Sequence, residues 1–378
     1  MLTEAIRAIY TTNLAVKRGE RVLIFTDRIS EREIFDARDQ CRRDRLRDVA
    51  LLTAEVGKSF TGKIVFHEYP STTSHGAEPP EELWRIAFGE KAVKALMKAG
   101  LLLPLLAKEI SDEDTKRAEA LVKKYGGASA DAVIALSNYS TSHTRFRDFL
   151  TRVCGARYAS MPLFEVSMLE GSMDVDWKAL AKRTISIAKM VNTAETIEVT
   201  TPHGTHVSFS KKGRKALPDT GMLTKPGSFG NLPAGEVFLA PLEGTAHGKL
   251  ILRWGPTREL QSPITLTVKN GCVIRVEGDE PYAETLKAKL DERKENRNIA
   301  ELGIGTNDRA KRPDNILESE KILGTIHIAL GDNSSFGGSV KTPFHQDFVF
   351  FRPTVVLIDK NGVKTTLMKD GKFEEIKR

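Results

Sequence analysis

Residues 324–351 read GTIHIALGDNSSFGGSVKTPFHQDFVFF, two apolar runs joined by a loop of small residues. The first run predicts a buried strand with His327 inside it. The second run opens with His345 and Asp347, which are two residues apart and therefore point to the same side of an extended segment. Polar groups within apolar strands are costly unless they are paired or metal-bound. These three side chains therefore fit a divalent-cation site, and they fit separate hydrogen-bonded positions equally well.

Two glutamates occur in comparable surroundings. Glu301 lies in the run AELGIGTN at residues 300–307, and Glu236 lies in LPAGEVFLAP at residues 232–241. A glutamate in a short apolar strand needs a partner, although a solvent-facing position on an alternating strand explains either residue taken alone. With the two histidines and Asp347 they provide three carboxylates and two imidazoles. That set suits one or two ions of zinc, manganese, cobalt or iron rather than calcium.

The first half of the chain alternates strands with helices. Buried strands are expected at residues 21–27, 63–68, 131–137 and 157–162, as in an α/β domain with a doubly wound, mostly parallel sheet. Neither GxGxxG nor GxxxxGK[ST] occurs in the chain, so we infer no nucleotide site.

From residue 195 onward the pattern changes to short strands joined by turns. Asn270-Gly271 and Asn361-Gly362 are strong hairpin signals. We therefore expect an α/β domain over residues 1–192 and a β-rich α+β domain over residues 193–378. The second domain carries the candidate metal ligands.

The composition excludes several classes of protein. The 378 residues suit two globular domains, and the net charge of +7 comes from basic residues scattered among acids, so no nucleic-acid surface is expected. The three cysteines are far apart and form no CxxC, which favours a reducing compartment without disulfides. No signal-peptide pattern opens the chain, and its most apolar run, residues 101–107, is too short to span a bilayer. We expect a cytoplasmic protein without membrane contact.

The segments that carry the acids and histidines resemble the aminopeptidase T family of metallopeptidases in their order and rough separations. They read GEVF at residues 235–238, AELGIGTN at 300–307, HIALG at 327–331 and His345-x-Asp347. The strand ERVLIFTD at residues 20–27 also resembles the start of that family. The resemblance implies an α/β domain, a distinct second domain and a homodimer. It also implies a two-metal centre that activates water to remove N-terminal residues from peptides.

Carried over residue by residue, the resemblance places all five acids and histidines on metal-binding positions. Glu236 or Glu301 would bridge the metals or act as general base, and the sequence does not divide these roles. The chain departs from the family at one catalytic position, because Ser334 stands where the family has a tyrosine seven residues after the first histidine. A serine hydroxyl is shorter and less acidic than a phenol. The candidate catalytic residues are thus Glu301, Glu236 and Ser334.

The broader superfamily includes an iron-dependent dioxygenase that opens dihydroxypyridine rings, and the loop between the two histidines is similar to that form. Its metal set would correspond to His327, His345 and Asp347, which suits non-haem Fe(II). Our leading hypothesis is an aminopeptidase that uses zinc, cobalt or manganese to hydrolyse small peptides. The alternatives are a mononuclear iron ring-cleaving dioxygenase with a small-molecule substrate and a non-catalytic metal-binding homologue.

Overall fold

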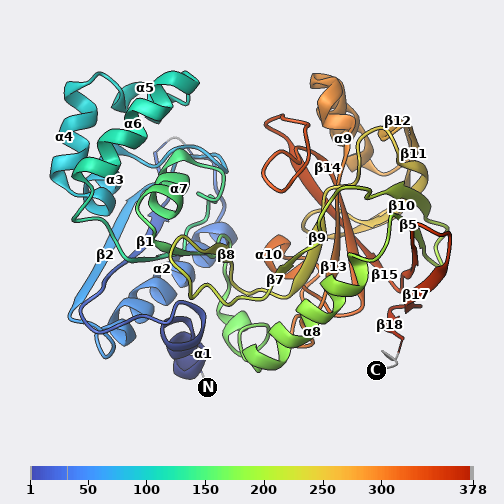
Figure 1. Ribbon diagram of the computed structural model, residues 1–378, viewed down its shortest axis with the longest axis horizontal. Helices are drawn as coiled ribbons and strands as arrows, with labels where there is room; N and C mark the ends of the chain where they lie inside the picture. Colours follow the sequence, from blue (N-terminus) through green and yellow to red (C-terminus); the bar gives the residue numbers. More distant parts are fainter. Residues whose placement is uncertain (1, 32, 375–378) are drawn as a thin grey trace. The chain divides into compact units, whose positions relative to one another are not determined.

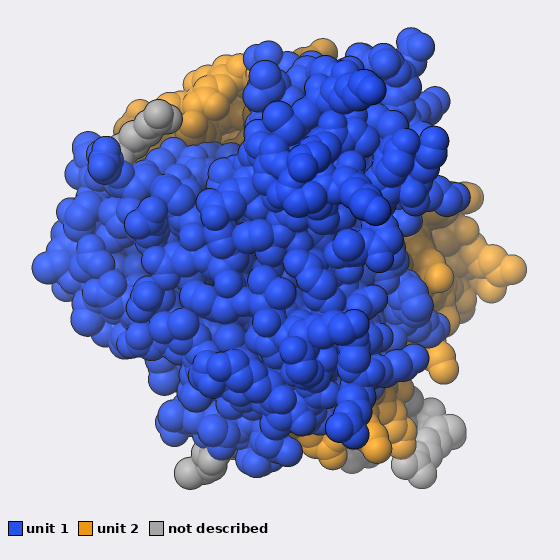
Figure 2. Space-filling model, turned by 90° about the vertical axis from the view of Figure 1, so that its left-hand side faces the viewer, with its two compact units in different colours: residues 1–174, 221–233 blue, residues 175–220, 234–378 orange. Residues whose placement is uncertain are grey.

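The computed structural model describes residues 2–31 and 33–374 (Figure 1). The chain forms two compact units, which are coloured separately in Figure 2. Unit 1 comprises residues 1–174 and 221–233, and unit 2 comprises residues 175–220 and 234–378. No helix among the described residues is long and apolar enough to cross a membrane.

Unit 1 is an α/β domain built on a five-stranded parallel sheet with the strand order β2-β1-β3-β4-β8. Strand β1, an internal strand of this sheet, is buried from Val22 to Asp27 because helices cover both faces of the sheet. Leu23 and Phe25 pack with the helices that follow β2, whereas α2 packs against β1 and β2. The strands are β1 (Arg21–Arg28), β2 (Lys63–Pro70), β3 (Ala132–Ala135), β4 (Arg157–Ser160) and β8 (Phe229–Asn231).

The sequence predicts one helix over residues 81–98, and the structure divides it into two. Gly89, with φ of 87°, separates α3 from α4 in a segment of continuous helical character. The helices are α1 (Leu2–Ala8), η1 (Ile9–Asn13), α2 (Ala37–Gly57), α3 (Glu81–Phe88), α4 (Glu90–Lys98), α5 (Leu102–Ala107), α6 (Asp112–Tyr125), α7 (Arg145–Asp148), η2 (Phe149–Val153) and η3 (Val166–Leu169).

Unit 2 is β-rich and contains two antiparallel sheets. One has the order β12-β11-β10-β6-β5-β16-β17-β18 and the other the order β15-β14-β13-β9-β7. Apolar side chains of both sheets form one core with residues of α8 and α9. The elements of the first sheet are β5 (Thr196–Thr200), β6 (His206–Ser210), β10 (His247–Trp254), β11 (Glu259–Lys269), β12 (Cys272–Glu277), β16 (Thr354–Ile358), β17 (Lys364–Lys369) and β18 (Lys372–Phe373).

The second sheet of unit 2 is the one that carries the candidate metal ligands, and we call it the site sheet. Its strands are β7 (Leu217–Asp219), β9 (Glu236–Leu239), β13 (Ile299–Gly305), β14 (Thr325–Gly331) and β15 (His345–Phe351). The helices of unit 2 are α8 (Trp177–Val191), α9 (Pro281–Glu292), η4 (Lys294–Arg297) and α10 (Ile316–Ser319). The α/β and β-rich fold classes expected for the two halves are confirmed.

The limits of the two units differ from the expected division after residue 192 in two places. Helix α8 belongs to unit 2, where it packs against β7 and β9. Residues 221–233 return to unit 1, because β8 within this segment pairs with β4 as the last strand of the parallel sheet. The chain therefore passes between the units three times.

Candidate metal centre

Strand pairing in the site sheet brings the five predicted residues to one face. Antiparallel pairing places Glu301 opposite Ala329, which is itself opposite Asp347. Two residues further along the same pair of strands, His345 lies opposite Gly331. Residues directly opposite each other in an antiparallel pair project to the same side. The alternate residues, among them Ile326, Ile328, Leu302, Ile304, Phe348 and Phe350, enter the core of unit 2.

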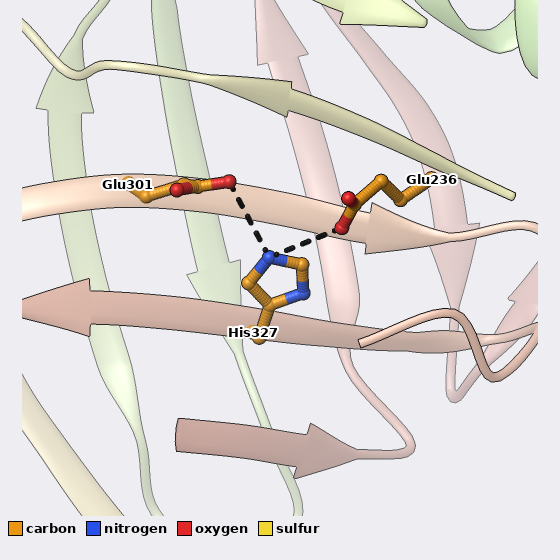
Figure 3. Close-up of side chains that lie close together, drawn as sticks. All are labelled: Glu236, Glu301 and His327. Atoms are coloured by element: carbon orange, nitrogen blue, oxygen red, sulfur yellow. Dashed lines mark ion pairs between the residues drawn. The ribbon is translucent and has the colours of Figure 1, made fainter. Parts of the chain in front are cut away.

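His327 is the centre of the first half of the cluster. Its Nε2 atom lies 3.4 Å from Oε2 of Glu236 and 3.5 Å from Oε1 of Glu301, and Figure 3 shows both carboxylates directed at this nitrogen. Oδ1 of Asp347 lies 4.0 Å from the same atom. The surrounding carboxylates outweigh the effect of burial and raise the pKa of His327 to about 9. The carboxylates around His327 thus stabilise a positive charge at this position.

His345 completes the second half of the cluster from the edge strand. Its Nε2 lies 3.4 Å from Oε2 of Glu301 and 3.5 Å from Oδ2 of Asp347. Its Nδ1 lies 2.8 Å from the backbone carbonyl oxygen of Asp332. A carbonyl oxygen only accepts, so Nδ1 carries a proton, and Nε2 is the nitrogen directed at the carboxylates of Glu301 and Asp347. This is the arrangement by which proteins orient a metal-binding imidazole.

The donor atoms fit a divalent ion. Glu236, Glu301 and His327 form one group of mutually close ligand atoms, and Glu301, His345 and Asp347 form a second, so Glu301 belongs to both. Ligand atoms that sit about 2.0–2.2 Å from one ion lie roughly 3.0–3.5 Å from each other, which matches the shortest separations here. Oε2 of Glu236 is also buried without a hydrogen-bond partner among the described residues. A cation would supply the partner that this oxygen lacks.

Gly303 makes the room that the His327 ring occupies. The two residues are direct partners in the β13–β14 pairing. A Cβ atom on Gly303 would lie 1.9 Å from Cε1 and 2.0 Å from Nε2 of the imidazole. The glycine in the AELGIG motif is thus required by the position of the ring.

Two residues of the centre, Glu320 and Lys321, were not identified from the sequence. Nζ of Lys321 donates to Oε1 of Glu236 and to Oε2 of Glu320, each at 2.7 Å, and its side chain is fully buried. Burial and the charges of Asp347 and Glu236 raise the pKa of Glu320, while Lys321 opposes this effect. In the sequence these residues form an ordinary charged pair after a short helix, and no local pattern marks them as buried.

Ser334 lies apart from the five. It is exposed, and its hydroxyl and backbone N–H donate to Oδ1 of Asp332, each at 3.1 Å. Among the described contacts, Ser334 connects to the cluster only through Asp332. Phe336 in the same loop lies closer to the cluster, with its ring centroid 6.2 Å from that of His345 and 5.7 Å from that of Phe238. Both phenylalanines were missed in the sequence, where they read as ordinary apolar residues.

Comparison with known proteins supports a dioxygenase family. Residues 167–373 match the family model NicX, described as 2,5-dihydroxypyridine 5,6-dioxygenase. A 2,5-dihydroxypyridine 5,6-dioxygenase of Pseudomonas putida is 25% identical over 195 residues, which are 47% of this chain and 55% of that protein. The match thus spans about half the length of that relative.

Two solved structures share the fold. The 2,5-dihydroxypyridine dioxygenase of Pseudomonas putida superposes with a TM-score of 0.68 at 18% identity, over 100% of this chain and 97% of the other. Aminopeptidase T of Thermus thermophilus superposes with a TM-score of 0.55 at 15% identity, over 99% of each chain. The expected relation to both proteins is therefore confirmed at the level of fold.

The sequence match and the structural likeness support different conclusions about the family of this chain. The likeness to the aminopeptidase is one of fold, whereas the family model covers more than half of this chain. An enzyme family is supported, and the peptidase activity that we expected first has no sequence match behind it. The chain belongs to the NicX family, described as 2,5-dihydroxypyridine 5,6-dioxygenase.

Proposed function

We propose that the protein is a metal-dependent dioxygenase that opens a dihydroxylated pyridine or a closely similar aromatic ring. The observation that carries this proposal is the convergence of His327 and His345 on Asp347, at 4.0 and 3.5 Å, in a buried acidic centre. Two imidazoles and one carboxylate suit ferrous iron. Family membership supplies the substrate class.

The aromatic residues beside the centre support a planar substrate. Phe336 is nearly perpendicular to the ring of His345, at 88°, and stands edge-on to Phe238 at 76°. Aromatic rings pair favourably at centroid separations of about 4.5–7 Å, so a third ring finds suitable partners here.

Each residue of the centre then has a distinct role. His327, His345 and Asp347 would hold ferrous iron, which supplies the activation of dioxygen when bound. Lys321 holds one oxygen of Glu236 at 2.7 Å and leaves Oε2 without a hydrogen bond. That free carboxylate oxygen is placed to accept a proton from a ring hydroxyl of the substrate. Glu301 lies between the two imidazoles and keeps both oriented by its separate oxygens.

A metal-exchange experiment tests the proposal. Protein freed of metal is loaded anaerobically with Fe(II) or with Zn(II) and mixed with 2,5-dihydroxypyridine in air-saturated buffer. We expect loss of the substrate absorbance with uptake of one O₂ per ring for the iron form only. Iron-loaded protein that consumes neither substrate nor O₂ would contradict the proposal.

Aminopeptidase activity is the second candidate, and one observation favours it. Two ligand groups that share Glu301 are the arrangement expected for a two-metal centre. The test is hydrolysis of leucine p-nitroanilide by protein loaded with zinc, cobalt or manganese. If neither substrate changes while metal still binds, the protein is a metal-binding homologue without turnover.

We also propose the homodimer and cytoplasmic location that the resemblance and composition lead us to expect. Light scattering at micromolar concentration tests the first, with twice the 41.9 kDa chain mass expected. Fractionation of the source cells tests the second.

A further inference from the structure

The ammonium of Lys321 is a cation built into the centre by the fold. Its side chain has no exposed surface, and such a charge is tolerated only when it is paired. It has two partners, Oε1 of Glu236 and Oε2 of Glu320. The pairing is therefore a fixed feature of the fold rather than a chance surface contact.

Backbone hydrogen bonds fix the segment that carries Lys321. The carbonyl oxygen of Lys321 accepts from the backbone N–H of Asn307 at 2.8 Å, and its own N–H donates to the carbonyl of Glu318 at 3.0 Å. The next residue packs against β13 where that strand ends, since a Cβ on Gly305 would lie 2.0 Å from the carbonyl oxygen of Ile322. The strand that carries Glu301 thus also holds the segment that carries Lys321.

The two ligand groups differ in their bonds to this charge. The group of Glu236, Glu301 and His327 includes a carboxylate that already receives the ammonium. Among the described residues, no hydrogen bond or ion pair joins the side chain of Lys321 to Glu301, His345 or Asp347. A divalent ion bound by Glu236 would stand close to a buried positive charge, where repulsion is weakly screened.

We propose that Lys321 occupies the place of a second metal ion and restricts the centre to one divalent cation per chain. Its ammonium is bonded directly to Glu236, which would otherwise serve as a ligand of a second ion. Lys321 is accordingly a positioning residue: it fixes Glu236 and acts through it. The inference rests on the metal centre of the proposed function but not on the reaction.

The test is metal stoichiometry in the full chain. Metal-free protein is titrated with Zn²⁺ by calorimetry, and the bound zinc is counted by mass spectrometry after desalting. We expect one ion per chain for the wild type and for Lys321→Arg, and two for Lys321→Met. Lys211→Met is the matched control, because Lys211 is also buried in unit 2 but its Nζ donates to the carbonyl oxygen of Ala194. That control should hold one ion.

One further variant guards against misfolding. The double variant Lys321→Met/Glu320→Gln removes one charge of each sign and is expected to bind two ions as well. Two ions in the wild type overturn the inference, as does a single ion in folded Lys321→Met.

The inference and the proposed function fail separately. Protein that binds one ion and gains a second in Lys321→Met, yet opens no ring, keeps the inference and loses the dioxygenase. If the wild type binds two ions and opens the ring, the dioxygenase proposal stands and the inference about Lys321 fails.

Discussion

The Nδ1 atom of His345 lies 2.8 Å from the backbone carbonyl oxygen of Asp332, thirteen residues earlier in the chain. The same Asp332 accepts from the backbone N–H of Thr342 with its carboxylate, at 3.0 Å. Asp332, at the start of the loop between the histidines, is thus bonded to Thr342 and to His345 at the end of that loop, and these bonds orient the imidazole. Because the imidazole is already oriented, it loses little further side-chain conformational entropy when it binds an ion.

His345→Ala should release the metal and leave the fold intact. We expect metal affinity to fall by at least about 100-fold, because even residues that only orient a ligand contribute roughly 10–100-fold. The side chain is 28% exposed, so its loss opens no sealed cavity and the thermal unfolding midpoint of the metal-free protein should change little. Equilibrium dialysis with Fe(II) or Zn²⁺ measures the affinity. His247→Ala, at an exposed histidine of the other sheet, is the control. Unchanged metal binding in His345→Ala would exclude this residue from the centre.

Gly303→Ala should displace the His327 ring. The added methyl would meet the imidazole at 1.9 Å, and overpacking of this kind typically costs about 1–3 kcal/mol. We expect weaker metal binding together with a lower unfolding midpoint. Gly62→Ala is the matched control, because no heavy atom lies within 4 Å of a Cβ at that position. Wild-type metal affinity in Gly303→Ala would mean that the ring position is not needed for binding.

Phe336→Ala should weaken binding of an aromatic substrate without releasing metal. Loss of one aromatic pair corresponds to roughly a 3- to 10-fold rise in KM. Steady-state kinetics and a metal count on the same sample separate the two effects. Phe35→Ala, at a half-exposed phenylalanine of unit 1, controls for general loss of aromatic surface. A fall in kcat with KM unchanged would argue against a substrate contact.

Glu78 should make the stability of unit 1 depend on pH. Burial raises its pKa to about 7 from an ordinary 4.5, although the backbone N–H groups of Arg145 and Phe146 at the start of α7 oppose the shift. The folded state therefore holds a proton that the unfolded state has lost. This contribution is fully present below pH 4.5 and disappears as the pH rises through 7, a change of about 3 kcal/mol.

Denaturant unfolding at pH 5 and pH 8 measures this dependence. Glu78→Gln cannot titrate, so it should show a smaller loss of stability between the two pH values than the wild type. The exposed Glu109→Gln should behave as the wild type. Equal pH slopes for Glu78→Gln and the wild type would show that this carboxyl group does not titrate differently in the two states.

The sequence predicted the fold classes because its first half alternates helical and strand patterns of apolar residues, whereas its second half shows short strand patterns joined by turns. The resemblance to the aminopeptidase T family placed the five acids and histidines together, whereas the strand pattern alone indicated only that His345 and Asp347 share a strand face. Lys321 and Glu320 could not be predicted. They lie in a connecting segment, and backbone hydrogen bonds of Asn307 with Lys321 and Leu323 carry them into the centre. The break at Gly89 was missed for a related reason, because helical spacing continues across a single glycine.

The triple passage of the chain between the units has a consequence for dissecting the protein. A fragment that ends at residue 174 contains four strands of the parallel sheet but lacks β8, so the outer edge of β4 would expose unpaired backbone groups. A fragment that begins at residue 175 would carry residues 221–233 as a segment whose partner strand is absent. Neither half of the gene therefore encodes a self-sufficient piece, and separate expression of unit 1 requires residues 221–233 to be joined back onto it.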